Sequence, residues 1–425
     1  MLFLEKLLFY LLVFCLPFQI RLILAQFSLS FNEWQTVFIY LTDFFVVALL
    51  ILWLKRTGGR VRQFYLIEVL VVLFLGISFL SLFDALSFGV GFYRWLKLVE
   101  FVFLFLYLRV SFLSVLNLRY FSWAWVGAAL SQSFLALGQF VRQTSLGFSF
   151  LGESYLNLDI AGVANFLVAG EKIMRAYGTL PHPNVLATFL GVGLFFLFFL
   201  FITKKDDSFL SDFIYFTLTG FLLGGLWVTF SRSVLMVIGI TFMFCLIWLS
   251  KESRRKVLFY ASFLFVWLLF WFLIFQEETL ARFTFSLKDQ AVVLRLAYQD
   301  IAFSFIDSFP FFGVGLGNFV FQIKATYSGL ADWLYQPVHN IYLLLASEVG
   351  LIGFCFFCYF ILLVLIQSFR RAYKEKRRIF LKIITCLLLS FVLIGFFDHF
   401  FFTLQSGQLM WWLVLGVLSG QAGRN

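Results

Sequence analysis

The sequence predicts an all-α, polytopic membrane protein, and the prediction follows from composition and from the length of the apolar runs. Of the 425 residues, 62% are hydrophobic and 13% are charged, whereas a soluble domain usually carries about 25% charged residues. The mean hydropathy is +0.97. Most of the surface is therefore expected to face hydrocarbon, where backbone polar groups must be paired internally. Long apolar runs, in place of short alternating segments, favour helices over a barrel.

About twelve apolar runs approach the roughly 20 residues that a helix needs to cross a membrane. They lie near 7–25, 37–54, 64–83, 95–110, 120–140, 184–202, 213–230, 234–250, 257–275, 341–366, 379–397 and 402–419. The first run begins after Glu5-Lys6 and lacks a small-residue cleavage signal, so we expect a span that is not removed. Residues 1–425 are accordingly expected to form a single integral membrane domain.

Short basic linkers follow alternate runs and orient the chain. They are Lys55-Arg56 with Arg60-Val61-Arg62, Lys204-Lys205, Lys251 with Arg254-Arg255-Lys256, and Arg370-Arg371 with Lys374 and Lys376-Arg377-Arg378. By the positive-inside rule, the side that collects them is the cytoplasm, and both termini are expected there. These linkers account for much of the net charge of +10, so the charge does not indicate nucleic-acid binding.

Two long connections are expected on the opposite, outer side, at about 142–183 and 276–338. The second is the longest stretch outside the predicted spans and contains a helical pattern at Ala291–Phe305. Long ordered loops on one face of a membrane protein usually carry function. We therefore expect the second connection to lie over the functional site.

Only three histidines occur, His182, His339 and His399, and all three fall at predicted outer boundaries. Each could simply sit at the level of the lipid headgroups. Alternatively, one of them could act as a general base, because neutral imidazole accepts a proton at neutral pH and nearby arginines would keep it neutral.

Arg232 is the most informative charge, because it lies in a link of a few residues between two apolar runs. Its guanidinium could reach the headgroups, or it could bind a phosphate, whose oxygens match the guanidinium fork. Arg295 lies among apolar residues on the predicted outer helix, where it could be a solvated charge, an interfacial anchor or a second phosphate ligand. Arg175 is a weaker candidate of the same kind.

Several common site motifs are missing from the sequence. Cys355 and Cys358 form a C-x-x-C inside an apolar run without a nearby histidine or charge, so no redox or metal role is expected for them. The absence of Asp-x-Asp, Walker A and metal-spaced His/Cys patterns argues against ATP-driven transport and metal-dependent sugar-nucleotide transferases. The alternate glycines in Pro310–Phe319 have the wrong spacing for a nucleotide loop and predict a tight turn or close backbone approach.

Several local patterns nevertheless occur in one order between about 175 and 405. In chain order they are Arg175…Gly178…Pro183-Asn184, Ser231-Arg232, Arg295, Pro310…Gly313-Val314-Gly315-Leu316-Gly317-Asn318-Phe319, His339-Asn340…Glu348-Val349-Gly350 and Asp398-His399…Leu404-Gln405. The order of these patterns, together with the topology and the outer location, resembles that of the O-antigen ligase and O-antigen polymerase superfamily of bacterial membrane glycosyltransferases.

The resemblance implies a GT-C-like membrane enzyme of about twelve helices in the bacterial cytoplasmic (inner) membrane, with its active site on the outer face. Such enzymes take a glycan from undecaprenyl diphosphate and join it to a hydroxyl of a glycan, lipid or protein acceptor, without a metal, a cofactor or a nucleotide sugar. The resemblance makes His339 the catalytic residue and Arg232 and Arg295 the diphosphate ligands. Supporting positions would be Arg175, Asn184, Asn340 and Glu348.

Two other classes of protein remain compatible with the sequence. A polysaccharide or lipid flippase would share the span count and the basic inner loops, but it should place polar residues in mid-span and show related halves. Here the polar residues concentrate at the outer boundary, and no repeat is found. A non-catalytic assembly scaffold is the third possibility. Ligation, polymerisation and protein glycosylation are not distinguished by the sequence.

Overall fold

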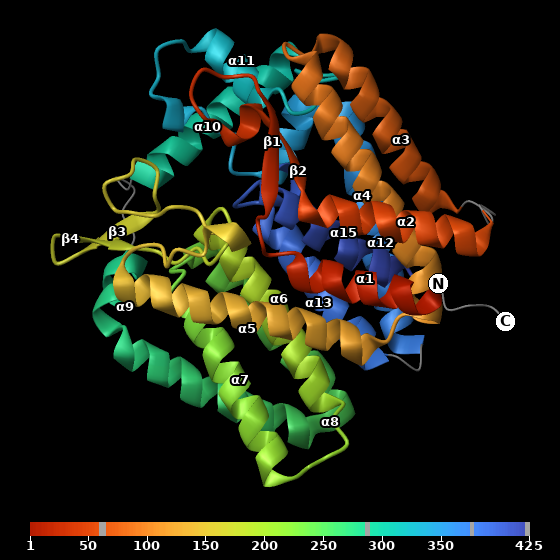
Figure 1. Cartoon of the computed structure of the whole chain (residues 1–425), viewed down its shortest axis with the longest axis vertical. Coiled ribbons are helices and arrows are strands. Elements are labelled where there is room, and N and C mark those ends of the chain that lie inside the picture. The colour runs from red at the N-terminus through yellow and green to blue at the C-terminus, as the bar shows by residue number, and fades with distance from the viewer. Residues whose placement is uncertain (59–64, 285–289, 375–377, 421–425) are drawn as a thin grey trace.

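The protein is mostly helical (Figure 1), in a computed structural model that describes residues 1–58, 65–284, 290–374 and 378–420. Within these residues, six helices are long and apolar enough to cross a membrane: Leu66–Asp84, Leu118–Arg142, Pro183–Ile202, Phe209–Trp227, Arg232–Ile274 and Ile341–Lys374. The predicted helical, multi-pass class is therefore supported. The predicted count of about twelve spans is not reached by this measure, because other apolar runs fall on helices that are shorter or more charged.

The described helices follow one another along the whole chain. They are α1 (Leu2–Cys15), α2 (Leu41–Thr57), α3 (Leu66–Leu80), α4 (Phe88–Val115), α5 (Leu118–Arg142), α6 (Pro183–Ile202), α7 (Phe209–Trp227), α8 (Arg232–Ile274), α9 (Gln276–Phe283), α10 (Gln290–Ser308), α11 (Phe319–Thr326), α12 (Ile341–Lys374), α13 (Arg378–Ile394), α14 (Phe400–Thr403) and α15 (Gln405–Ser419). Helix α6 is buried along its length and lies at the centre of the bundle.

Two antiparallel hairpins were not predicted. Strand β1 (Arg21–Gln26) pairs with β2 (Thr36–Tyr40), and β3 (Asn165–Val168) pairs with β4 (Glu171–Met174). The prediction of one helical span over 7–25 is therefore wrong after Cys15, where α1 ends. Pro17 follows this end, and because a proline lacks the backbone N–H, it cannot donate the hydrogen bond that would continue the helix.

Helix α8 is interrupted at Ser253, whose φ of −156° and ψ of 68° are not helical. The interruption separates two segments, 232–252 and 254–274, which correspond to the two runs predicted near 234–250 and 257–275. The second segment packs along α7, since Trp267 Nε1 donates to the carbonyl of Phe216 at 2.8 Å and Trp271 Nε1 donates to that of Gly220 at 3.0 Å. Figure 1 shows α7 and α8 together at the bottom of the view.

Helix α12 is interrupted at Gly350, where φ is 70°. The glycine-rich loop predicted to make a close backbone approach docks at this point: Val314 N donates to Ser347 O at 2.8 Å, and Leu351 N donates to Pro310 O at 2.8 Å. A side chain at Gly350 would place its Cβ 2.1 Å from the carbonyl oxygen of Phe311. The predicted close approach is therefore confirmed, and it pairs the backbone groups that the interruption frees.

Among the described residues, the two long connections contain no helix that is both long and apolar enough to be a span. The first holds β3 and β4, and the second holds α9, α10 and α11. The helix predicted at Ala291–Phe305 is confirmed as α10.

The two ends of the bundle differ in their polar side chains. At one end, residues of the basic linkers pair with acidic residues: Arg56 with Glu5, Lys204 with Asp212 and Lys256 with Asp207. Among the other linker residues, Arg60, Arg62, Lys376 and Arg377 lie outside the described residues. The opposite end holds the hairpins and all three histidines, and it is the end that the candidate site occupies.

Candidate functional site

The three histidines come together at the end of the bundle opposite the basic linkers. His182 precedes α6, His339 precedes α12, and His399 lies between α13 and α14. The imidazole rings of His339 and His399 approach edge to face, with centroids 5.2 Å apart and planes at 72°. Sequence analysis placed each histidine at a boundary, and the fold gathers them into one cluster.

His339 is held at the start of α12 with one ring nitrogen buried. The next residue, Asn340, caps the helix, because its Oδ1 accepts from the backbone N–H of Tyr342 at 2.9 Å and of Leu343 at 3.1 Å. The ring of His339 is partly exposed and lies beside the ring of Tyr298 on α10. Its buried Nδ1 has no hydrogen-bond partner among the described residues. The imidazole is thus oriented by packing and is open on one side.

Asp398 joins the histidine cluster to the link before α8. Its Oδ1 accepts from the backbone N–H of His399 at 2.8 Å, and its Oδ2 accepts from Asn184 Nδ2 at 2.7 Å. Asn184 Oδ1 in turn accepts from Ser231 Oγ at 2.7 Å and from Arg175 Nη2 at 2.8 Å. All of these residues, Ser231 included, are at most 6% exposed. The supporting residues predicted at the start of α6 therefore bridge His399 to Ser231.

Arg232 is the first residue of α8 and follows Ser231 directly, so this bridge fixes where it lies. Its side chain is partly buried. Arg295 lies on α10, and its positive charge lowers the pKa values of His182, His339 and His399. The structure therefore brings Arg295 within electrostatic range of the whole cluster and places Arg232 at its edge.

Desolvation keeps the imidazoles neutral. It lowers the pKa of His339 below the ordinary 6.5, with Arg295 adding to the effect and Asp398 opposing it. Desolvation also lowers the pKa of His399 to about 3, against the opposing charge of Asp398. Burial disfavours ionisation of Asp398, but the surrounding histidines and the hydrogen bond from Asn184 hold its pKa below its usual range. At neutral pH the cluster combines a carboxylate with uncharged rings that can accept protons.

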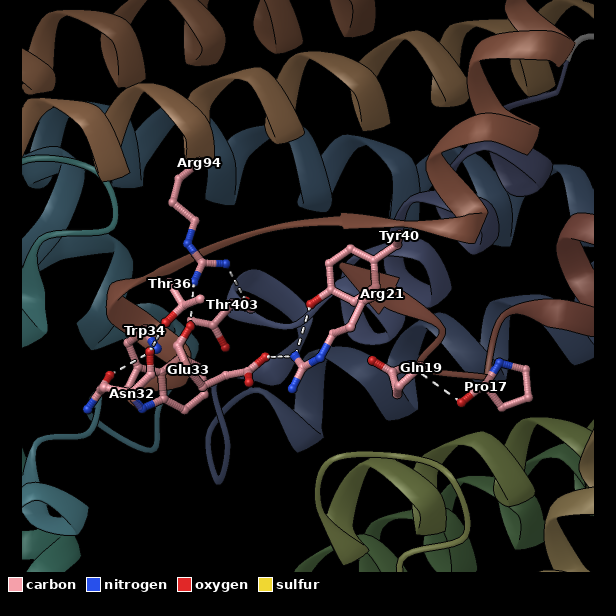
Figure 2. A network of polar contacts seen from close by, with 10 residues as sticks. All are labelled: Pro17, Gln19, Arg21, Asn32, Glu33, Trp34, Thr36, Tyr40, Arg94 and Thr403. Carbon is pink, nitrogen blue, oxygen red and sulfur yellow. Dashed lines mark hydrogen bonds and ion pairs between the residues drawn. The ribbon is translucent and has the colours of Figure 1, made fainter. Parts of the chain in front are cut away.

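A second polar network, drawn in Figure 2, joins the N-terminal hairpin to Thr403, which lies in the turn that follows His399. Trp34 packs edge-on against the imidazole of His399, with ring centroids 5.1 Å apart. His399 Nδ1 also shares a hydrogen bond of 2.7 Å with Thr403 Oγ1. Arg94 donates to the carbonyl of Thr403 at 2.9 Å and to that of Glu33 at 3.4 Å, which ties the hairpin to this turn. Trp34, Thr403, Arg94 and Glu33 were not singled out from the sequence.

Glu348 lies in a different setting from the other predicted residues. It is 4% exposed, and its two carboxylate oxygens accept from the backbone N–H of Gly317 at 2.9 Å and of Phe319 at 3.2 Å. It therefore stabilises the glycine-rich loop. Gly317 of this loop, Trp34 and Arg94 line a cavity of about 30 Å³.

Arg282 on α9 is a cation near the cluster that sequence analysis missed. Its Nε donates to the carbonyl of Phe230 at 3.2 Å, and its charge contributes to lowering the pKa of Arg175. Arg295 also lowers the pKa of Arg175, so three like charges, those of Arg175, Arg282 and Arg295, lie within electrostatic range of one another. Such an arrangement favours an anionic ligand.

Among the described residues, no group of three or more histidine, cysteine, aspartate or glutamate side chains is arranged to hold one metal ion. The imidazoles of His339 and His399 instead meet ring to ring.

Residues 216–358 match the family model described as O-antigen ligase. The match supports membership of the O-antigen ligase and polymerase superfamily. The matched segment includes Arg232, Arg295 and His339, whereas Arg175, Asn184 and the Asp398-His399 pair lie outside it. Comparison with curated proteins gives no match. The match supports glycan transfer of the ligase or polymerase type, and the apolar helices support a multi-pass membrane protein.

Proposed function

We propose that the protein transfers a glycan from undecaprenyl diphosphate to an acceptor hydroxyl on the outer face of the bacterial inner membrane. The observation that supports this most is His339, a partly exposed imidazole kept neutral beside Arg295, inside the segment that matches the O-antigen ligase family. The fold is proposed to be of the GT-C type with about twelve spans. In support, each of the twelve apolar runs overlaps a helical segment of the structure.

In the proposed reaction, the acceptor hydroxyl attacks the anomeric carbon of the donor glycan. His339 removes the hydroxyl proton, and the bond between the anomeric carbon and the diphosphate oxygen breaks, so that undecaprenyl diphosphate leaves with the bonding electron pair. Attack opposite the leaving group inverts the configuration at the anomeric carbon. The guanidinium groups of Arg232 and Arg295 stabilise the charge that develops on the diphosphate, and no metal or cofactor takes part.

Asp398 has an electrostatic role in this scheme. Its negative charge raises the pKa of His339 and so favours the imidazolium that forms as the hydroxyl loses its proton. Asn184, held by Arg175, keeps the carboxylate in place through the 2.7 Å hydrogen bond. The predicted supporting residues Arg175 and Asn184 are thus proposed to position Asp398, whereas Asn340 and Glu348 hold helix α12 and its loop.

Reconstitution in proteoliposomes tests the proposed function against the flippase alternative. With a labelled undecaprenyl diphosphate-linked glycan and an acceptor glycan, we expect the label to move to the acceptor, with release of undecaprenyl diphosphate and no effect of EDTA. The measurement is chromatographic separation of lipid-linked and acceptor-linked label. Movement of intact donor across the bilayer without a new glycosidic bond would instead establish a flippase, and inhibition by EDTA would contradict the metal-free mechanism.

The pH at which activity is lost on the acidic side should depend on the pKa of His339. Transfer requires the neutral imidazole, and its lowered pKa means that activity should fall only below about pH 6.5, the ordinary histidine value. Asp398 raises this pKa and Arg295 lowers it. We therefore expect Asp398→Asn to shift the acid limb to lower pH and Arg295→Ala to shift it to higher pH. Initial transfer rates measured between pH 4 and 8 give the pH at which activity falls on the acidic side. Shifts of this pH in the same direction for both variants would contradict the assignment of His339 as the base.

A further inference from the structure

The link between α7 and α8 has a strained backbone just before Arg232. It comprises residues 228–231, and Phe230 in this link has a φ of 44°. A bulky residue rarely adopts a positive φ, because its Cβ then crowds the backbone. Such a conformation persists only where the surrounding structure holds it. We therefore looked for the groups that hold Phe230.

Both long connections contact this link through its backbone carbonyls. Arg175 Nε, from the first connection, donates to the carbonyl of Thr229 at 2.7 Å. Arg282 Nε, from α9 in the second connection, donates to the carbonyl of Phe230 at 3.2 Å. A charged donor binds an acceptor more strongly than a neutral donor does. Two consecutive carbonyls before Arg232 are therefore each held by a guanidinium.

The ring of Phe230 is enclosed as well. Phe230 is 1% exposed, and its ring centroid lies 4.8 Å from that of Phe166 on β3 and 5.5 Å from that of Phe140 on α5. The guanidinium carbon of Arg282 lies 5.7 Å from the centroid of the same Phe166 ring, where a cation is attracted to the aromatic face. Strand β3 packs against α9 (Figure 1). Phe166 thus contacts both the ring of Phe230 and the arginine that binds its carbonyl.

We propose that Arg282 is a positioning residue for the donor: by holding Phe230 at its positive φ, it sets the direction in which Arg232 points toward the diphosphate. This inference rests on the proposed glycan transfer. Arg232 follows Phe230 by two residues, so a change in the backbone angles of Phe230 turns the first residues of α8 relative to the histidine cluster. The second connection thereby controls donor binding through the backbone of the link.

The charge of Arg282 fits a link that is prepared for an anion. Burial lowers the pKa of Arg175, and the nearby charge of Arg282 lowers it further, so like charges repel each other across the link. A neutral donor could hold the carbonyl of Phe230 without this repulsion. A diphosphate at Arg232 would offset the repulsion, because it brings negative charge to the same place.

A double-mutant cycle on glycan transfer tests the proposal in the reconstituted full chain. Arg282→Met removes the charge and the donor but keeps a long side chain. We expect it to lower kcat/KM for the lipid-linked donor about tenfold, the effect of losing one charge-assisted hydrogen bond. In the Arg232→Ala background the same substitution should cause no further loss, because its effect passes through Arg232. In the Arg295→Ala background the full loss should remain.

Two matched variants separate positioning from a general loss of charge. Lys172→Met removes a positive charge from an exposed position on β4, the partner strand of β3, and should leave kcat/KM unchanged. Arg282→Lys keeps a charged donor on a long side chain and should recover most of the activity. Lysine at Arg232 should recover only part of it, since contact with the diphosphate uses the parallel donors of guanidinium.

The pH dependence gives a further readout. Besides desolvation, the charges that shift the pKa of His339 are those of Asp398 and Arg295. Arg282→Met should therefore lower the rate without moving the pH at which activity is lost on the acidic side. A shift of this pH would mean that Arg282 acts on the base and not on Arg232.

The outcomes distinguish failure of this inference from failure of the proposed function. If the unaltered protein transfers glycan and Arg282→Met causes the same loss with and without Arg232, Arg282 binds the donor directly or only stabilises the fold, and the positioning role is wrong. The role is also wrong if Arg282→Met behaves as Lys172→Met. If the unaltered protein transfers no glycan, both proposals fail. Should Arg282→Met not fold, Phe166→Leu takes its place in the cycle, because it removes the ring beside the guanidinium.

Discussion

His339→Ala is expected to reduce glycan transfer by roughly 10²–10⁴-fold, the usual contribution of a positioned general base. The acceptor hydroxyl is a weak nucleophile, and the structure offers a neutral imidazole at the open side of the cluster to take its proton. Asp398 favours the protonated ring after that step. The measurement is the single-turnover rate of label transfer from the lipid-linked donor to the acceptor.

The substitution should not unfold the protein. Because Nδ1 of His339 has no hydrogen-bond partner among the described residues, removal of the ring leaves no described donor unpaired at that atom. Asn340 still caps α12 through its own side chain. His339→Gln is the matched variant, since it keeps a polar side chain of similar size without a basic nitrogen. Both variants should elute as the unaltered protein does in detergent, and both should show the strongly reduced transfer rate. Near-normal transfer by either would remove the catalytic assignment.

The helices and the residues of the site differ in how far the sequence predicts them. Apolar periodicity places α5, α6, α7 and both segments of α8, because each is a long uninterrupted run. It fails at the first run, where leucine and isoleucine continue past Pro17 into β1. Hydropathy is similar for an apolar strand and an apolar helix, so composition alone does not distinguish them.

The candidate site, too, is predicted by the sequence only in part. Histidines and arginines are rare in an apolar chain, so their positions at the boundaries of runs make them visible from the sequence. Their convergence is a property of the fold, since Asn184 and Asp398 are 214 residues apart in the chain. Trp34 and Thr403, which hold His399, gave no signal because tryptophan and threonine at such boundaries are ordinary in membrane proteins.

The sequence predicts one property of the glycine-rich loop and misses another. Alternate glycines predicted a close backbone approach, and Gly313, Gly315 and Gly317 all have positive φ angles. The partner of the loop was not predictable, because the interruption of α12 at Gly350 leaves no trace in an apolar pattern. Glu348, selected from the resemblance as a supporting residue, proves to hold this loop rather than to face the histidines.

Arg232→Ala and Arg295→Ala are each expected to lower kcat/KM for the lipid-linked donor by roughly 10–100-fold. A hydrogen bond between charged groups contributes about 1.5–3 kcal/mol, and negative charge on the diphosphate grows as the glycosidic bond breaks. Lysine at either position should restore only part of the rate, since ammonium lacks the two parallel donors of guanidinium. The measurement is the initial transfer rate over a range of donor concentrations.

Arg142→Ala serves as the matched control, because this exposed arginine in the last turn of α5 has no role in the proposed site. It removes the same positive charge and should leave kcat/KM unchanged, so a general electrostatic effect of losing one arginine can be separated from loss of a diphosphate ligand.

The two site arginines, Arg232 and Arg295, should also differ from each other. Arg295 acts on the pKa of His339 as well as on the donor, so only Arg295→Ala should combine weaker donor use with a shifted acid limb. Equal, small effects of all three substitutions would mean that the diphosphate binds elsewhere.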